Sequence, residues 1–209
     1  NATGMVNTWD YDIFISKLNS NGNFIWAKQI KGNQTFSQYA NAIDLDIFGD
    51  VLITGDFGGD VDFDPGGGVY NLTSASGGAS GSNGFVCKLD ASGTFVWAKN
   101  IVNNTFAEVS DISTDAIGNI YTTGRYQGTG DFYPGIGSYN LYASGGSLDY
   151  DIFISKLDVN GNFVWANTMG GNSGNNTNGS GDRGNSIDVG PLGNIYVYHL
   201  IDKLLHFQD

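Results

Sequence analysis

Three aspartates alternate along one short stretch, "DVDFDPG" at 60–66, and their spacing could support metal chemistry. In an extended strand, the side chains of Asp60, Asp62 and Asp64 would project to the same face. Three neighbouring carboxylates repel one another unless a cation or water compensates, and calcium prefers such oxygen clusters. The stretch therefore predicts a weak calcium site, against the simpler interpretation of a Pro-Gly turn carrying solvated acids.

A second copy of this stretch, "GTGDFYPG" at 128–135, limits the metal interpretation. It keeps one of the three aspartates, Asp131, and has Thr129 and Tyr133 at the other two positions. A metal site in every copy is therefore not predicted, and the turn is the favoured interpretation.

Side chains for nucleophilic catalysis are scarce in this sequence. Cys87 is the single cysteine, which excludes a disulfide framework or a cysteine-based zinc site within one chain. The two histidines, His199 and His206, both lie close to the end, so a Ser-His-Asp or Cys-His site lacks a base. The other copies of the repeat have serine at the position of Cys87, which predicts a small buried residue. We expect no enzyme; carboxylate-based action on polysaccharides is the least favoured alternative.

Composition excludes several further classes. The net charge of −12 argues against binding to nucleic acid or to anionic membrane surfaces, which needs clustered lysine and arginine. No apolar run approaches the roughly 18–20 residues that span a bilayer. The 32 glycines stand beside 13 phenylalanines and 11 tyrosines, a composition typical of short strands between turns rather than of disorder.

The chain repeats itself. "DYDIFISKLNSNGNFIW" at 10–26 returns as "DYDIFISKLDVNGNFVW" at 149–165, and "GSNGFVCKLDASGTFVWAK" at 81–99 is a third copy. A second block alternates with the first, giving a period of about 70 residues, as in propellers, solenoids or arrays. The landmarks of the first block are Lys17, Lys88 and Lys156, and Trp26, Trp97 and Trp165.

Each period contains four strand-like runs, which in the first complete unit are 42–46, 51–57, 84–89 and 94–99. Tight hairpins such as "DIFGD" and "DVNGN" carry glycine at the fourth position, as expected for a type I turn followed by a left-handed residue. Aspartate or asparagine at the first position of most hairpins can accept hydrogen bonds from its own turn.

The strands are apolar on both faces. In "DIFISKL", Ile13 and Ile15 fall on one face and Phe14 and Leu18 on the other, which predicts a small sheet held between neighbouring sheets. This is the geometry of a β-propeller blade. The predicted fold is therefore all-β, with four-stranded antiparallel blades of about 70 residues forming an incomplete ring of about three blades.

The predicted units are a leading half-blade at 1–40, complete blades at 41–109 and 110–184, and a trailing half-blade at 185–209. The end, "YHLIDKLLHFQD" at 198–209, departs from the repeat. The helical spacing of Leu200, Leu204 and Phe207 predicts an amphipathic helix or an aberrant terminus. Truncation or a reading-frame error near Tyr198 and a genuine capping segment both stay open.

The repeated tryptophans and lysines each allow two interpretations. Trp26, Trp97 and Trp165 could stack on sugars, although packing between blades is favoured because each lies on the same face as a phenylalanine. The three lysines could form a ring of cations, although an ion pair between blades with an aspartate such as Asp12 or Asp151 is favoured.

The blocks "DIFISKLDVNGNFVWA", "DxxGNIYxTGxFxG" and "DFDPG" together resemble the SBBP-type bacterial β-propeller repeat over about residues 10–197. The resemblance implies a secreted or cell-surface bacterial protein of Bacteroidetes type. We expect a non-enzymatic scaffold for adhesion or for binding a protein or glycan. The alternative is a structural repeat that self-associates through its half-blades into a filament or array.

Overall fold

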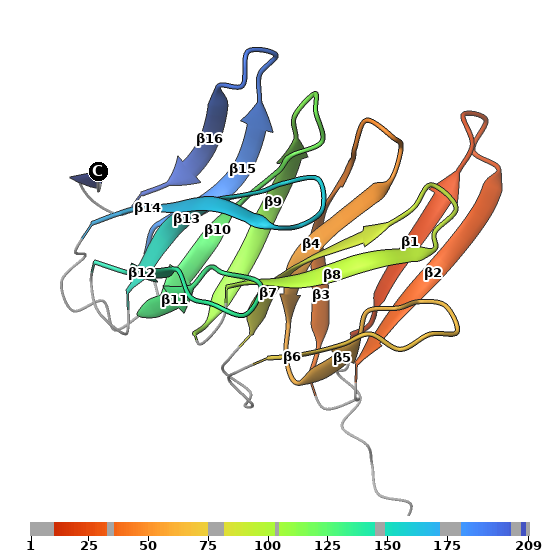
Figure 1. Ribbon diagram of the computed structural model, residues 1–209, viewed down its shortest axis with the longest axis horizontal. Coiled ribbons are helices and arrows are strands. Elements are labelled where there is room, and N and C mark those ends of the chain that lie inside the picture. The colour runs from red at the N-terminus through yellow and green to blue at the C-terminus, as the bar shows by residue number, and fades with distance from the viewer. Residues whose placement is uncertain are drawn as a thin grey trace, which may run out of the picture.

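The computed structural model describes residues 11–32, 36–74, 82–102, 105–144, 149–171, 181–201 and 206–207 (Figure 1). These residues form 17 β-strands and contain no helix, so the all-β prediction is confirmed. The strands gather into antiparallel sheets that stand one behind another along the molecule (Figure 1).

Two sheets are complete blades of four antiparallel strands. The first has the order β3-β4-β7-β8, and the second the order β9-β10-β13-β14, with a short fifth strand added beside β14. The strands of the first are β3 (Gln38–Leu45), β4 (Val51–Phe57), β7 (Asn83–Leu89) and β8 (Phe95–Val102). Those of the second are β9 (Ala107–Thr114), β10 (Ile120–Gln127), β13 (Tyr150–Leu157) and β14 (Phe163–Gly170).

A two-stranded hairpin stands at each end of the stack. The leading hairpin is β1 (Ile13–Leu18) with β2 (Phe24–Gly32), and the trailing hairpin is β15 (Arg183–Val189) with β16 (Ile195–Leu200). Lys17 pairs with Trp26 in the register that joins Lys88 to Trp97. The leading hairpin therefore corresponds to the third and fourth strands of a blade, and the trailing hairpin to the first two.

Each complete blade sends a short insertion hairpin toward the preceding sheet. In the first blade this is β5 (Asp60–Asp62) with β6 (Asn71–Thr73), and β5 pairs with β2 of the leading hairpin. In the second blade it is β11 (Thr129–Asp131) with β12 (Asn140–Tyr142), and β11 contacts β8 of the first blade. The insertions therefore tie each blade to the one before it.

The end of the chain follows the repeat, contrary to the expectation from its sequence. The predicted amphipathic helix is wrong where the structure describes this segment: β16 continues to Leu200, and β17 (His206–Phe207) is a strand. β17 pairs with β14, placing His206 opposite Gly170. The equivalent strand β5 places Asp62 opposite Lys31. The backbone of β17 therefore takes the place of an insertion strand of a third unit.

Sheets inside the stack bury both faces, as the two-sided apolar pattern predicts, whereas Phe14 and Leu18 of the leading hairpin are exposed. In β7, Phe85 and Cys87 lie in the core between the leading hairpin and the first complete blade. Their neighbour Val86 points the opposite way, into the core between the two complete blades. All three side chains are fully buried, and each large apolar side chain buried in this way contributes about 1.5–3 kcal/mol.

The hairpin turns have the predicted geometry. The fourth residue of each is a glycine with φ between +76° and +86°, a left-handed conformation that costs other residues energy. The first residue accepts backbone hydrogen bonds across its own turn. Asp158 Oδ1, for example, accepts from Asn160 N at 2.8 Å and from Asn162 N at 2.9 Å.

Candidate binding site

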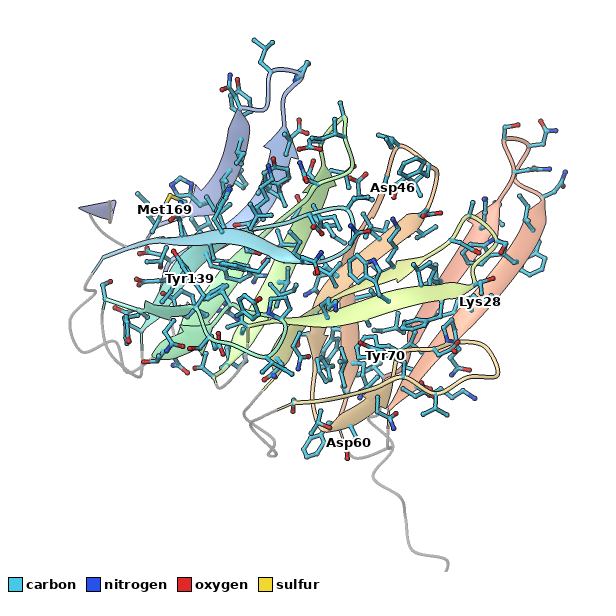
Figure 2. The ribbon with its side chains drawn as sticks, in the orientation of Figure 1. Lys28, Asp46, Asp60, Tyr70, Tyr139 and Met169 are labelled. Carbon is cyan, nitrogen blue, oxygen red and sulfur yellow. The ribbon has the colours of Figure 1, made fainter. Side chains whose placement is uncertain are left out.

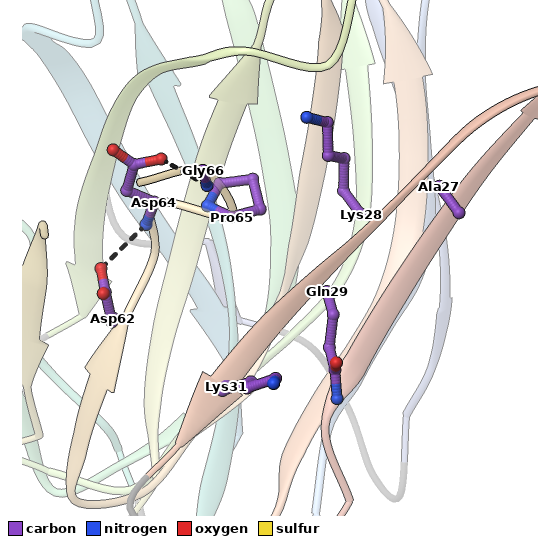
Figure 3. A pocket seen from close by; sticks show the side chains of 8 residues that line it. All are labelled: Ala27, Lys28, Gln29, Lys31, Asp62, Asp64, Pro65 and Gly66. Atoms are coloured by element: carbon purple, nitrogen blue, oxygen red, sulfur yellow. Dashed lines mark hydrogen bonds between the residues drawn. The ribbon is translucent and has the colours of Figure 1, made fainter. Parts of the chain in front are cut away.

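A groove of about 390 Å³ lies between strand β2 and the loop that joins β5 to β6 (Figure 3). One wall carries Lys28, Gln29 and Lys31 from β2, and the other carries Asp62 and Asp64 (Figure 3). Among the described residues, no ion pair joins the lysines of one wall to the aspartates of the other. The groove therefore presents charges of both signs to an incoming molecule.

The aspartate wall is held in place by the alternation of the strand. Phe63, between the two aspartates, points inward and packs on Phe57 and Phe85, with ring centroids 5.3 and 4.9 Å away. Asp62 and Asp64 consequently point outward, on the side of the groove (Figure 3).

Both aspartates organise the loop that carries them. Asp62 Oδ1 accepts hydrogen bonds from Asp64 N at 3.1 Å and Tyr70 N at 2.8 Å, and Asp64 Oδ1 accepts from Gly66 N at 2.7 Å. Gly68 approaches so closely that a Cβ there would lie 2.2 Å from Asp64 Oδ2. The glycines of "DFDPGGG" therefore allow the loop backbone to wrap around a carboxylate.

The three aspartates do not form the predicted cluster. Asp60 Oδ1 accepts a hydrogen bond from Thr73 Oγ1 at 2.6 Å, while Asp62 and Asp64 bind their own loop. Within the part of the chain that the structure describes, no group of three or more histidine, cysteine, aspartate or glutamate side chains could hold a metal ion. Calcium has no support from this geometry.

The second insertion hairpin shows what the repeated aspartate does. Asp131 Oδ1 accepts hydrogen bonds from Tyr133 N at 3.0 Å and Tyr139 N at 2.8 Å, the same two loop positions that Asp62 binds in the first copy. The ring of Tyr139 lies 4.8 Å from Phe163, as Tyr70 lies 4.9 Å from Phe95. Figure 2 shows both tyrosines on their insertion hairpins. The aspartate is therefore a loop organiser in both blades.

The three repeated lysines have three different environments. Lys88 is buried, with its Nζ 2.7 Å from Asp46 Oδ2 and 3.2 Å from Asp50 Oδ2. Lys17 donates to the carbonyl of Ala91 at 2.8 Å, in a turn of the following blade. The ammonium of Lys156 lies 4.9 Å from the centre of the Tyr121 ring.

The expected partners Asp12 and Asp151 are wrong for these lysines. Asp12 accepts from Gln29 Nε2 at 2.7 Å, and Asp151 accepts from Ser144 N at 2.9 Å. Blade-specific residues explain why the lysines diverge: Tyr121 donates its hydroxyl to Asp115 at 3.1 Å, at the turn where the first blade has Asp46. Lys156 therefore lies over the tyrosine ring.

The repeated tryptophans lie at the boundary between sheets. The ring of Trp26 contacts Gly93 and that of Trp97 contacts Gly161; a Cβ on either glycine would lie 3.2 Å from the ring. Each glycine belongs to a hairpin turn of the following blade. Trp165 packs within its own blade, edge-on to Tyr121 at 6.3 Å. All three side chains are partly buried.

The sequence did not predict one cluster of charged side chains that joins two blades. Glu108 on β9 receives Arg125 of its own blade at 2.8 Å and also pairs with Arg183 of β15. Arg125 stacks on the ring of Tyr150 at 4.7 Å. The copies carry different residues at these positions: the first complete blade has Tyr39 and Asp56 where the second has Glu108 and Arg125, so repetition gave no signal. The one indication in the sequence is that Glu108 and Arg183, of opposite charge, lie 75 residues apart, close to one repeat period.

Two carboxyl groups are perturbed by their surroundings. Burial raises the pKa of Asp56 to about 6, offset in part by a hydrogen bond from Asn41. Burial likewise raises the pKa of Asp151 to about 6; hydrogen bonds from Ser144 lower it, and the charges of Asp182 and Asp149 raise it.

Both carboxyl groups accept side-chain hydrogen bonds, Asp56 from Asn41 and Asp151 from Ser144. Asp56 and Asp151 lie outside the groove, whose lining is given above. The single thiol, Cys87, is buried as expected, and burial raises its pKa. His199 lies on β16, with Nδ1 3.3 Å from the carbonyl of Val197. None of these four side chains lines the groove.

Comparison with known proteins places the chain near one repeat protein. No family model matches the sequence. A protein named "Uncharacterized WD repeat-containing protein L264", from Acanthamoeba polyphaga mimivirus, is 27% identical over 197 residues. The match covers 89% of this chain and 14% of that protein, so the chain spans a small part of its relative's length. WD repeats form β-propellers, in agreement with the blades described above. No helix among the described residues has the length and apolar character needed to cross a membrane.

Proposed function

We propose that this chain is part of a non-enzymatic β-propeller scaffold that binds a protein partner through the groove between β2 and the β5–β6 loop. The observation that supports the proposal is that the aspartates that organise the loop recur in both units, whereas the residues that line the groove differ between them. Asp62 and Asp131 build the same loop, but Lys31 and Asp64 of the groove correspond to Val102 and Tyr133 in the next unit. Loops that vary on a constant frame are typical of recognition surfaces.

The charges of the groove favour a charged peptide segment as its ligand. Lys28, Lys31, Asp62 and Asp64 line one space of about 390 Å³, enough for a few side chains. Exposed charges of this kind chiefly steer association and select partners, and salt screens them. We therefore expect binding that weakens as ionic strength rises.

The wider setting belongs to the same proposal. The resemblance to SBBP-type repeats supports a secreted or cell-surface bacterial protein that serves adhesion, and a glycan in place of a protein ligand. The WD-repeat relative supports a scaffold built from propeller blades. The division into units at 1–40, 41–109, 110–184 and 185–209 is the corresponding proposal for how the blades follow one another.

Binding to arrays of charged peptides and of glycans tests the proposed function. The expected result is a peptide signal that the double variant Lys28→Ala/Lys31→Ala loses. Lys99→Ala is the matched control, because Lys99 stands at the same strand position as Lys28 in the next unit, outside the groove. Binding to glycans alone would show that the ligand is a glycan rather than a peptide. Binding that the groove variants leave unchanged would show that the groove is not the binding site.

A second candidate function is a structural repeat that assembles between chains. The two half-blades favour it, because a hairpin of third and fourth strands stands at one end of the stack and a hairpin of first and second strands at the other.

A further inference from the structure

The leading face of the stack leaves apolar side chains uncovered that the repeat elsewhere buries. Phe14 is 70% exposed, whereas the equivalent Phe85 and Phe153 are 0% exposed. Ile43 on β3 is 60% exposed, whereas the equivalent Ile112 is 4% exposed. Both exposed residues line one apolar groove of about 230 Å³ between β1 and β3. A neighbouring unit covers the equivalent positions inside the stack.

The trailing face is uncovered in the complementary way. Tyr196 on β16 is 62% exposed, whereas the equivalent Tyr121 on β10 is 3% exposed. Tyr198 and Leu200 of the same strand are also exposed. Within the described residues, β16 pairs with β15 alone, while β10 pairs on its other side with β13.

The internal blades show what belongs in the groove. In both complete blades, the second strand pairs with the third strand and packs on the first strand of the next blade, as β4 does with β7 and β9. The groove lies between a third strand, β1, and a following first strand, β3. The missing neighbour is therefore a second strand, and β16 is a second strand without a third.

We propose that a second copy of this chain fills the groove, so that β16 of each copy pairs with β1 of the other and completes a blade. This proposal gives a partner and a register to the second candidate function above. Two copies of the 209 residues would together supply six blades to a closed ring. Propellers typically hold about four to eight blades, and closure removes both open sheet edges.

The ladder between β10 and β13 predicts the register. It joins Ile120 to Leu157, Thr122 to Ser155 and Gly124 to Phe153. Transferred to the composite blade, Ile195 lies opposite Leu18, Val197 opposite Ser16 and His199 opposite Phe14. The same transfer places Lys17 over the ring of Tyr196, repeating the contact of Lys156 with Tyr121.

One position resists this pairing and provides a sharp variant. A Cβ on Gly124 would lie 2.9 Å from the ring of Phe153, and the trailing strand has His199 there. Within its own hairpin, His199 lies opposite Gly184. The ring of Phe14 must therefore rotate aside in the composite blade. His199→Gly relieves this conflict and is expected to lower the dimer dissociation constant about tenfold.

Sedimentation velocity of the 209-residue chain is the first test. The proposal predicts a concentration-dependent species of twice the 22.3 kDa chain mass. Phe14→Asp and Tyr196→Asp are expected to weaken it about 100-fold or more, as loss of a buried aromatic anchor does. Ile136→Asp is the matched control, since Ile136 is a fully exposed apolar residue on the β11–β12 loop. Unfolding midpoints of the variants separate weak association from loss of fold.

Disulfide trapping is the second test, in a Cys87→Ser background. The hydroxyls of Thr122 and Ser155 lie 2.6 Å apart, so the equivalent pair Ser16→Cys and Val197→Cys should cross-link two copies. The offset pair Ser16→Cys and Tyr196→Cys should not. A monomer at every concentration, a polymer longer than the dimer, or equal trapping of both pairs would each overturn the closed ring. The charged groove on β2 lies outside this interface, so its peptide binding succeeds or fails separately.

Discussion

Lys88 Nζ lies 2.7 Å from Asp46 Oδ2, joining the third strand of the first complete blade to the turn between its first two strands. Both side chains are almost fully buried. Figure 2 shows Asp46 at the end of the sheets away from Asp60. In the next blade, the equivalent Lys156 faces a tyrosine ring instead. The same repeated residue therefore has an ionic role in one blade and an aromatic contact in the other.

Replacing the two lysines should separate these roles. Lys88→Met leaves the Asp46 carboxylate buried without its partner and should lower the free energy of unfolding by about 3 kcal/mol. Lys156→Met should cost about 1 kcal/mol or less, because it removes one cation–π contact. Urea unfolding followed by tryptophan fluorescence measures both. Equal losses of unfolding free energy in the two variants would contradict an ionic role for Lys88 and an aromatic contact for Lys156.

The turn glycines provide a test of packing between blades. Gly161→Ala and Gly193→Ala both place a side chain at positive φ, and each should cost about 1–2 kcal/mol. Gly161→Ala carries an additional loss, because its Cβ would lie 3.2 Å from the ring of Trp97, while a Cβ on Gly193 meets nothing within 4 Å. The measurement is the difference between the two unfolding free energies. A difference of zero would show that Trp97 does not pack on the following blade.

Stability should depend on pH through Asp151. Its pKa is raised from 3.8 to about 6 in the folded chain, so folding favours the protonated form. This contribution is fully present below about pH 4 and is lost as pH rises through about 6. Asp151→Asn, which keeps a neutral side chain, should therefore gain stability relative to the parent chain at pH 7.5 by about 1–3 kcal/mol.

The hairpin aspartates oppose this trend at lower pH. Burial raises the pKa of Asp158, but hydrogen bonds from Asn162 and Asn160 prevail and hold it below its usual value. The stability from Asp158 is present above about pH 4 and is lost as pH falls further. Thermal melts should therefore show a maximum between about pH 4 and 6. Stability that rises steadily from pH 5 to 8 in the parent chain would contradict both assignments.

Removal of calcium should leave the protein unchanged. Asp60, Asp62 and Asp64 accept hydrogen bonds from the insertion hairpin, and no metal-binding group of three forms among the described residues. Asp62→Ala should cost about 1–2 kcal/mol through the loss of two loop hydrogen bonds, with or without calcium. Melting in calcium and in chelator checks this; a higher melting temperature in calcium that Asp62→Ala abolishes would restore the metal site.

Repetition explains how much of this structure could be predicted from the sequence. Several copies contain the turn glycines, the aspartates that accept hydrogen bonds in the same turns, and the strands with two apolar faces. Each copy therefore supports the structure predicted from the others. The alternating aspartates at 60–64 show a limit of sequence patterns. A strand pattern places carboxylates on one face without showing that Phe63 anchors them and loop amides bind them.

The remaining errors arise where copies differ or partners are distant. The lysine partners depend on whether a blade has Leu52 or Tyr121, a choice outside the repeated motif. The end of the chain lost its repeat signature, and its leucine spacing pointed to a helix, yet backbone pairing with β14 keeps β17 in the position of an insertion strand. Tertiary pairing there overrides local propensity.

Native-state labelling of Cys87 tests the central claim most directly, because this single thiol lies in the core between the leading hairpin and the first complete blade. If the sheets are stacked face to face, a thiol reagent should label Cys87 only at denaturant concentrations where tryptophan fluorescence reports global unfolding. Rapid labelling in native buffer, with the sheet structure intact by circular dichroism, would show that the blades do not cover one another.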